Sequence, residues 1–132
     1  IITDGFDNPI GQIDSLLINA TNISVDNVCD VVSGFGGICY PAHIDRDSNG
    51  IIAVLGTLPA DNKFEFFELH DGSKISEYSE KFDIPKERFI ISSDAHYLTN
   101  MRDAEFFFEL CAQGDDDVEI RHSLFRLLRG DV

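Results

Sequence analysis

The chain has 132 residues, of which 43% are hydrophobic and 26% are charged. This length and apolar content predict one domain with a buried core and exclude a chain that is disordered throughout. Its 24 acidic residues outnumber 10 basic ones and give a net charge of −14. That charge argues against duplex nucleic acid or an anionic membrane as the main partner, and no apolar run approaches the length of a membrane span.

The first residue and the cysteines of the chain suggest what kind of protein it comes from. The sequence begins with Ile1 and not with methionine, so we expect it to be part of a longer protein. No secretory signal opens it. The three cysteines are an odd number without a CxxC pair, which predicts reduced thiols that behave as small apolar residues in a cytoplasmic protein.

The first third of the chain predicts one helix and one strand. Residues 1–23 show little periodicity and are expected to be an irregular lead-in, in which residues 16–18 form either a short strand or a docked segment. A helix is predicted from Ser24, its N-cap, to the glycines that follow Ser33. Its apolar face is Val25, Val28, Cys29 and Val32. Residues 38–40 then predict a short buried strand that leads into Pro41-Ala42-His43.

The rest of the chain repeats this order of strand and helix. Residues 64–69 and 88–91 predict strands, with a helix between them that Ser73 caps. Residues 105–110 predict a strand, although a helical spacing also fits there. The last helix begins at Asp115–Asp117 and ends before Gly130, with arginines near its C-terminus. Its apolar face is Ile120, Leu124, Leu127 and Leu128. Strands that alternate with helices at this spacing predict a single α/β unit over residues 1–132, with parallel strands.

Two of the predicted strands end in a histidine beside an acidic residue. His43 is followed by Asp45 and Arg46, and Asp94-Ala95-His96 follows the strand at 88–91. Ligands of parallel α/β folds bind beyond the carboxyl ends of the strands, and on an extended strand Asp94 and His96 point the same way. An imidazole and a carboxylate aimed at one point suit Zn, Mn or Fe. The alternative is a general acid–base pair in which Asp94 orients His96.

The other two histidines have less distinctive surroundings. His70 follows the strand at 64–69, but the next residues form a turn into a helix, so we expect His70 to be structural or solvated. His122 lies one position off the apolar face of the last helix and is expected on the surface. Glu68 is likewise expected to be structural.

The segments GGICYPAHIDR (36–46) and ISSDAH (91–96) resemble the PHP (polymerase and histidinol phosphatase) family. The resemblance covers residues 14–129 approximately. It identifies the Ala-His segment with the third metal-binding motif of that family and Asp-x-His with the fourth. It therefore implies that His43, Asp94 and His96 bind metal, that Asp94, His96 and Arg46 take part in catalysis, and that Arg46 contacts a substrate phosphate.

The same resemblance implies a fold and an activity. PHP domains are distorted (β/α)₇ barrels that open with a His-x-His motif, which this chain lacks, so the chain is expected to be the C-terminal part of such a barrel. The intact parent would be a metal-dependent phosphoesterase with two or three divalent ions, Mn, Zn or Fe, acting on a small phosphate ester or a short nucleotide. The alternative is a non-catalytic binding or assembly module with an incomplete metal site. Since half a barrel exposes strand edges, a homodimer of the fragment is also expected.

Overall fold

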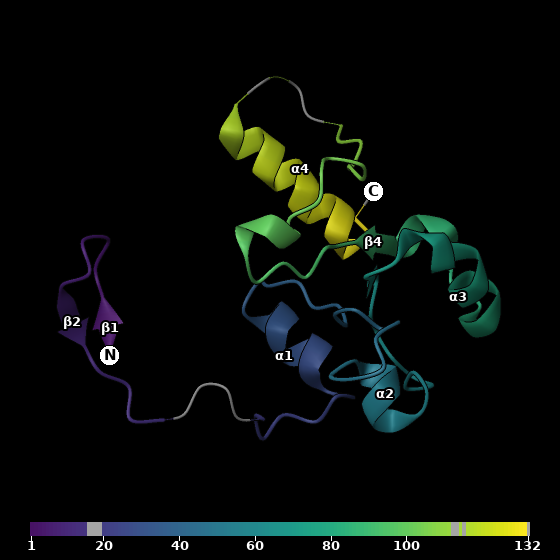
Figure 1. Cartoon of the computed structure of the whole chain (residues 1–132), viewed down its shortest axis with the longest axis horizontal. Helices are drawn as coiled ribbons and strands as arrows, with labels where there is room; N and C mark the ends of the chain where they lie inside the picture. Colours follow the sequence, from purple (N-terminus) through teal and green to yellow (C-terminus); the bar gives the residue numbers. More distant parts are fainter. Residues whose placement is uncertain (16–19, 112–113, 115, 132) are drawn as a thin grey trace.

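The computed structural model describes residues 1–15, 20–111, 114 and 116–131. These residues form a mixed α/β fold with four α-helices and two small sheets of two strands each (Figure 1). The α/β class is therefore confirmed at this level. Within the described part of the chain, no helix is both long enough and apolar enough to cross a membrane.

The first sheet is an antiparallel hairpin in the segment that we expected to be irregular. Strands β1 (Ile2–Thr3) and β2 (Pro9–Gly11) pair with each other. The turn between them depends on Asp4, whose Oδ1 accepts hydrogen bonds from the backbone N–H groups of Phe6 (2.8 Å) and Asn8 (3.0 Å). The expectation of an irregular lead-in over residues 1–23 is thus wrong for residues 2–11, where the turn-forming residues join two strands. The predicted element at 16–18 lies outside the described residues.

The second sheet pairs two parallel strands that are joined through a helix. Strand β3 (Phe67–Leu69) pairs in register with β4 (Phe89–Ile91). Helix α3 (Ile75–Phe82) lies between them in the sequence, flanked by the 3-10 turns η1 (Gly72–Lys74) and η2 (Lys86–Arg88). Parallel strands require such a crossover, so the predicted strand–helix–strand order is confirmed here. β3 is shorter than the predicted strand at 64–69.

The hydrophobic core surrounds this parallel pair. Leu69 in β3 is 0% exposed, and Ile44, which belongs to the same core cluster, is 1% exposed. The rings of Phe64 and Phe67 meet edge to face with centroids 6.1 Å apart, and Phe67 also contacts Phe89 of β4. Aromatic pairs of this kind add to the stabilisation that burial alone provides. The partly buried side chains packed against the core are Val25, Val28, Cys39, Ile51, Ile52, Ile75, Tyr78, Phe82 and Ile91.

The last helix follows its local sequence signals closely. α4 (Asp117–Arg129) has Asp116 as its N-cap, and the Asp116 carboxylate accepts a hydrogen bond from the N–H of Val118. Gly130 ends the helix with φ 72°, in the left-handed region that glycine adopts without strain. His122 is exposed, as expected.

The other helices begin at residues that the sequence did not single out. α1 (Val28–Gly34) starts after Asn27, so Ser24 is not its N-cap; the Ser24 hydroxyl instead bonds within the preceding turn. α2 (Ile51–Leu55) was not predicted. Asp71, and not Ser73, caps the turn that leads into α3, because its carboxylate accepts from both the N–H (2.9 Å) and the hydroxyl (2.7 Å) of Ser73.

Two predicted strands are absent from the structure. Residues 38–40 belong to no strand, and residues 105–110 are neither strand nor helix. A strand needs a neighbour that supplies ladder hydrogen bonds, and apolar residues alone do not provide one. The later segment is held by side chains instead: Phe106 lies against Gly72, where an added Cβ would be 2.5 Å from the ring, and Phe108 meets Phe66 edge to face.

Candidate functional site

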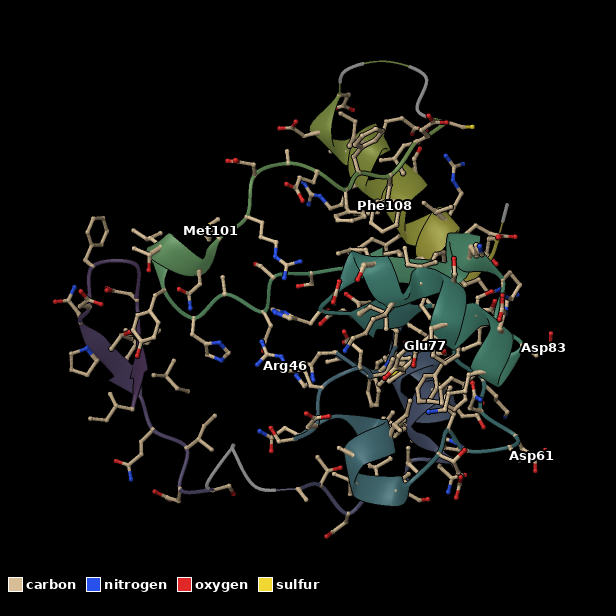
Figure 2. All side chains as sticks on the ribbon, turned by 45° about the vertical axis from the view of Figure 1, so that its right-hand side comes forward. Arg46, Asp61, Glu77, Asp83, Met101 and Phe108 are labelled. Atoms are coloured by element: carbon tan, nitrogen blue, oxygen red, sulfur yellow. The ribbon has the colours of Figure 1, made fainter. Side chains whose placement is uncertain are left out.

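Three segments meet beyond the carboxyl ends of β3 and β4. They are residues 41–46, the residues that follow β3, and residues 92–103, which follow β4 and include the 3-10 turn η3 (Leu98–Asn100). In Figure 2, Arg46 lies on the same side of the body as the turn that carries Met101, while Asp61 and Asp83 lie on the opposite side. This edge of a parallel sheet is where α/β proteins place their ligands.

Glu68 fixes the first of these segments to β3. Its N–H donates to the carbonyl of Pro41 (3.0 Å), and its own carbonyl accepts from the N–H of Ile44 (2.8 Å). In regular parallel pairing, the two residues that bond to one residue of the neighbouring strand have a single residue between them, whereas two lie between Pro41 and Ile44. The chain therefore bulges here, and His43 has a φ of 31°. The N–H of His43 is satisfied by the Glu68 carboxylate at 3.2 Å. The expectation that Glu68 is structural therefore agrees with its contacts.

Asp45 anchors the residues that follow β3. Its side chain is 2% exposed, and its two oxygens accept from the N–H of His70 (2.7 Å) and the N–H of Asp71 (2.9 Å). The ammonium group of Lys74 lies 3.8 Å away. Because a buried carboxylate must be paired and hydrogen-bonded, these contacts explain how it is accommodated. Asp45 is thus engaged by the backbone, and it positions His70.

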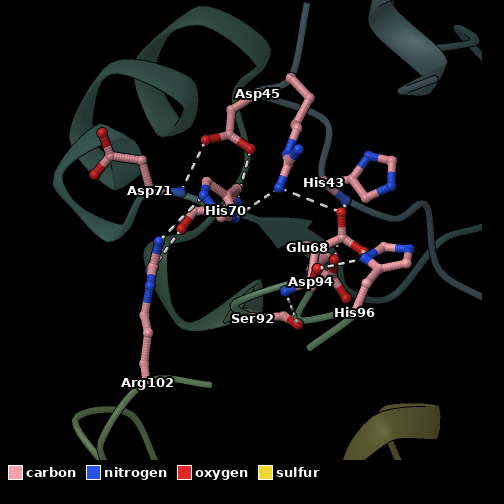
Figure 3. Close-up of polar contacts among 10 residues, drawn as sticks. His43, Asp45, Glu68, His70, Asp71, Ser92, Asp94, His96 and Arg102 are labelled. Carbon is pink, nitrogen blue, oxygen red and sulfur yellow. Dashed lines mark hydrogen bonds and ion pairs between the residues drawn. The ribbon is translucent and has the colours of Figure 1, made fainter. Parts of the chain in front are cut away.

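His70 lies between two guanidinium groups, as the dashed contacts in Figure 3 show. Arg46 Nη2 is 3.4 Å from Nδ1 of His70, and Arg102 Nη2 is 3.2 Å from Nε2. Arg102 also donates through Nη1 to the His70 carbonyl at 2.7 Å. A neutral imidazole accepts through only one of its nitrogens, so it satisfies one of the two arginines at a time. The other guanidinium keeps a donor that an anion would accept.

The Arg46 guanidinium is also paired with Asp94. Its Nη2 lies 3.3 Å from Oδ2 of Asp94, and both side chains are partly exposed. Among the described residues, Arg102 forms no ion pair with a carboxylate, in contrast to Arg46. The site therefore combines an arginine that forms an ion pair with a carboxylate and, among the described residues, one that forms none.

Asp94 and His96 are close together, but not for the reason that we expected. β4 ends at Ile91, and Asp94 has φ 49°, so the two residues do not lie on an extended strand. Nδ1 of His96 is 2.9 Å from the Asp94 carbonyl oxygen and 3.9 Å from Oδ1 of its carboxylate. Since a carbonyl only accepts, Nδ1 carries the proton, and in the neutral ring Nε2 is left with a lone pair. The side chain is 75% exposed, so this nitrogen is accessible to a ligand.

His43 does not complete a metal site with this pair. Its Nδ1 is buried without a hydrogen-bond partner, and Figure 3 draws no contact to its ring. Across residues 1–15, 20–111, 114 and 116–131, no three His, Cys, Asp or Glu side chains come together as metal ligands. Asp94 also faces the cationic Arg46. The described residues therefore do not fit a complete divalent-metal centre.

A cavity of about 440 Å³ opens beside this cluster, which is large enough for a small metabolite. Its polar lining residues are Tyr40, Glu68, Ser92, Ser93, Arg102 and Asp103. Burial raises the pKa of the Tyr40 phenol, and the negative charge of Glu68 raises it further. Tyr40 is therefore a neutral hydrogen-bond donor at physiological pH.

The structure thus brings together part of the predicted site and adds two residues to it. Arg46, Asp94 and His96 are neighbours, whereas Nδ1 of His43 forms no hydrogen bond with them. His70, which we expected to be structural or solvated, lies at the centre, and Arg102 was not predicted at all. Its part in the site could have been predicted from the sequence, because His70 directly follows a predicted strand. No local sequence pattern indicates Arg102, because its contact with His70 depends on the tertiary fold, which brings residue 102 next to the end of β3.

Searches with this chain against protein-family models, curated proteins and solved structures found no match.

Proposed function

We propose that this chain binds the phosphate group of a small phosphorylated compound, as the phosphate-binding part of a metal-dependent phosphoesterase of the PHP type. The observation that carries the proposal is the pair of arginines on either side of His70, beside a cavity at the carboxyl ends of β3 and β4. Guanidinium groups match the geometry and the charge of phosphate oxygens. The chain has a net charge of −14, so two arginines that converge on one site carry the charge opposite to that of the protein as a whole.

The geometry suggests a separate role for each residue in binding the phosphorylated compound. Arg102 would contact the phosphate directly, since no carboxylate among the described residues pairs with it. Arg46 would contribute a second guanidinium if the anion displaces Asp94 from it, and Asp94 would then be released toward His96. Tyr40 and the serines of the cavity wall would bind the remainder of the compound. The strongly acidic surface favours a small substrate over duplex nucleic acid.

Calorimetric titration with glycerol phosphate tests the phosphate site. Arg102→Gln should weaken binding roughly tenfold or more, because a hydrogen bond to a charged group contributes about 1.5–3 kcal/mol. The matched control is Arg121→Gln, which removes an exposed arginine on α4 and should leave the affinity unchanged. Equal affinities for the wild type and both variants would contradict the proposed site, as would an absence of binding in all three.

The second candidate function is a non-catalytic binding or assembly module. It is favoured by the lack of a three-ligand metal group among the described residues and by the Arg46–Asp94 ion pair. Exposed aromatic side chains such as Phe35 and Phe107 also suit a surface for assembly. Under this alternative the site would bind the phosphorylated compound without hydrolysing it, and the bound compound would regulate or recruit a partner protein.

A titration with Mn²⁺ separates the two candidates. If the chain belongs to a metal-dependent enzyme, we expect glycerol phosphate and Mn²⁺ each to tighten the binding of the other, because phosphate oxygens supplement the donors of Asp94 and His96. His96→Ala should abolish this coupling, while His122→Ala, on the exposed face of α4, should preserve it. Phosphate binding that is the same with and without Mn²⁺ would favour the module.

A further inference from the structure

Two cysteine side chains from different segments meet next to the core. Cys29 belongs to α1 and is 8% exposed, and Cys39 lies in the segment that leads to Pro41. Cys39 packs against the core cluster that contains Cys29, and both line one small cavity of about 70 Å³ together with Lys63. The two thiols are therefore neighbours within one pocket of the fold, and not isolated apolar residues.

The electrostatics of Cys29 support this closeness. The pKa of its thiol is raised to about 11, first by burial and then by charge repulsion and hydrogen bonding from Cys39. Asp30 raises it slightly more, and Lys63 lowers it. Cys29 thus remains a protonated thiol at neutral pH, next to the sulfur of Cys39. A thiol in this state is a poor first nucleophile.

Cys39 is the more accessible of the two. It is half-buried, and it also lines a second, larger and open cavity of about 420 Å³ with Tyr40 and Ala42. A small oxidant therefore reaches Cys39 from this side, whereas Cys29 faces inward. This arrangement resembles the pairing of an attacking cysteine with a resolving one.

We propose that Cys29 and Cys39 form a reversible redox modification site, at which a peroxide converts the two thiols into an intramolecular disulfide. The Cys39 thiolate attacks one peroxide oxygen, the O–O bond breaks, and a sulfenic acid and water form once a proton is taken up. The Cys29 sulfur then attacks the sulfenic sulfur and displaces hydroxide, which takes the Cys29 proton. In total, hydrogen peroxide is reduced to two water molecules while two thiols are oxidised to one disulfide. A small dithiol reverses the step.

Such a bond would tie α1 to the segment that enters the candidate functional site. Residue 39 directly precedes Tyr40, which lines the cavity beside Glu68 and Arg102. Closing a covalent loop restricts the unfolded chain and stabilises the folded one, provided that the native geometry accepts the bond. We therefore expect the oxidised chain to unfold at a higher temperature than the reduced chain.

The test uses the full chain with Cys111→Ser, which removes the exposed third thiol and with it the main route to intermolecular disulfides. After treatment with equimolar hydrogen peroxide, we expect both remaining thiols to disappear together, with a mass loss of two hydrogen atoms. Chymotrypsin cleaves after Phe35, which lies between the cysteines, so the two resulting peptides should stay joined until dithiothreitol is added. The oxidised chain should contain no intermolecular disulfide and should melt at a higher temperature.

The single variants Cys29→Ser and Cys39→Ser, each in the Cys111→Ser background, complete the test. With Cys29 replaced, Cys39 should accumulate as sulfenic acid, which a dimedone probe labels; with Cys39 replaced, Cys29 should stay reduced. The proposal would be overturned if the two thiols of the parent oxidise independently to sulfinic acids. It would also be overturned if both stay reduced until the protein is unfolded by urea.

Discussion

Replacing Asp45 with asparagine should lower the free energy of unfolding by about 1–3 kcal/mol, because a buried hydrogen-bond donor loses its acceptor. The Asp45 carboxylate accepts from the N–H groups of His70 and Asp71 with separate oxygens. An asparagine side chain of the same shape has one oxygen and one NH₂ group, so one of the two backbone donors would face another donor. The charge that attracts Lys74 at 3.8 Å would be lost as well.

Urea denaturation of Asp45→Asn beside Asp47→Asn provides the measurement. Asp47 is exposed, so its replacement should change stability by no more than about 0.5 kcal/mol. The same change of charge in both variants isolates the effect of burial. If the two unfold at the same urea concentration, the backbone contacts of Asp45 do not stabilise the residues after β3, and His70 is positioned by something else.

The other large effect is expected at Leu69, the centre of the parallel pair. Leu69→Ala should destabilise the fold by about 2–5 kcal/mol, because it removes buried methyl groups and leaves a cavity that the neighbouring strands cannot fill completely. Leu69 is fully buried, and its carbonyl also accepts from the N–H of Ser92 at 3.1 Å. A loss of this size is a large part of the total stability of a small domain, about 5–15 kcal/mol.

Two further variants keep this prediction interpretable even if Leu69→Ala does not fold. Leu69→Met conserves volume and should cost less than about 1.5 kcal/mol. Leu98→Ala removes the same atoms from a side chain that is 86% exposed, and it should unfold almost as the wild type does. Circular dichroism during urea denaturation measures all three. Equal losses for Leu69→Ala and Leu98→Ala would show that β3 is not at the centre of the core.

Local signals explain which elements the sequence predicted correctly. α4 begins and ends where its capping residues Asp116 and Gly130 indicate, and these act on their own backbone without help from the rest of the chain. The parallel pairing of β3 with β4 was also predictable, since two apolar runs separated by a helix have few other ways to pair. The strands expected at 38–40 and 105–110 failed because their existence depends on distant partners that a local pattern does not specify.

The candidate site was predictable only in part, for a similar reason. Asp94 and His96 were found because they follow the apolar run that forms β4, and such residues gather at one edge of a parallel sheet. Arg46 was assigned only through the resemblance to PHP domains. The contacts among them could not be inferred, because the chain leaves the extended conformation at Asp94. Arg102 reaches His70 from a segment without regular structure, and no periodicity predicts where such a segment returns. The resemblance to PHP domains remains a prediction.

The left-handed backbone at His43 and at Asp94 has a consequence for how this sequence can vary. A residue with a side chain loses roughly 1–2 kcal/mol in that conformation, whereas glycine loses almost nothing. Selection for stability alone would therefore drift toward glycine at both positions. Aspartate tolerates this conformation better than most residues, so the cost is larger for the imidazole of His43 than for the carboxylate of Asp94. In a set of natural variants, glycine at either position would then identify chains that lack the side chain proposed for this site and have less strained backbone there.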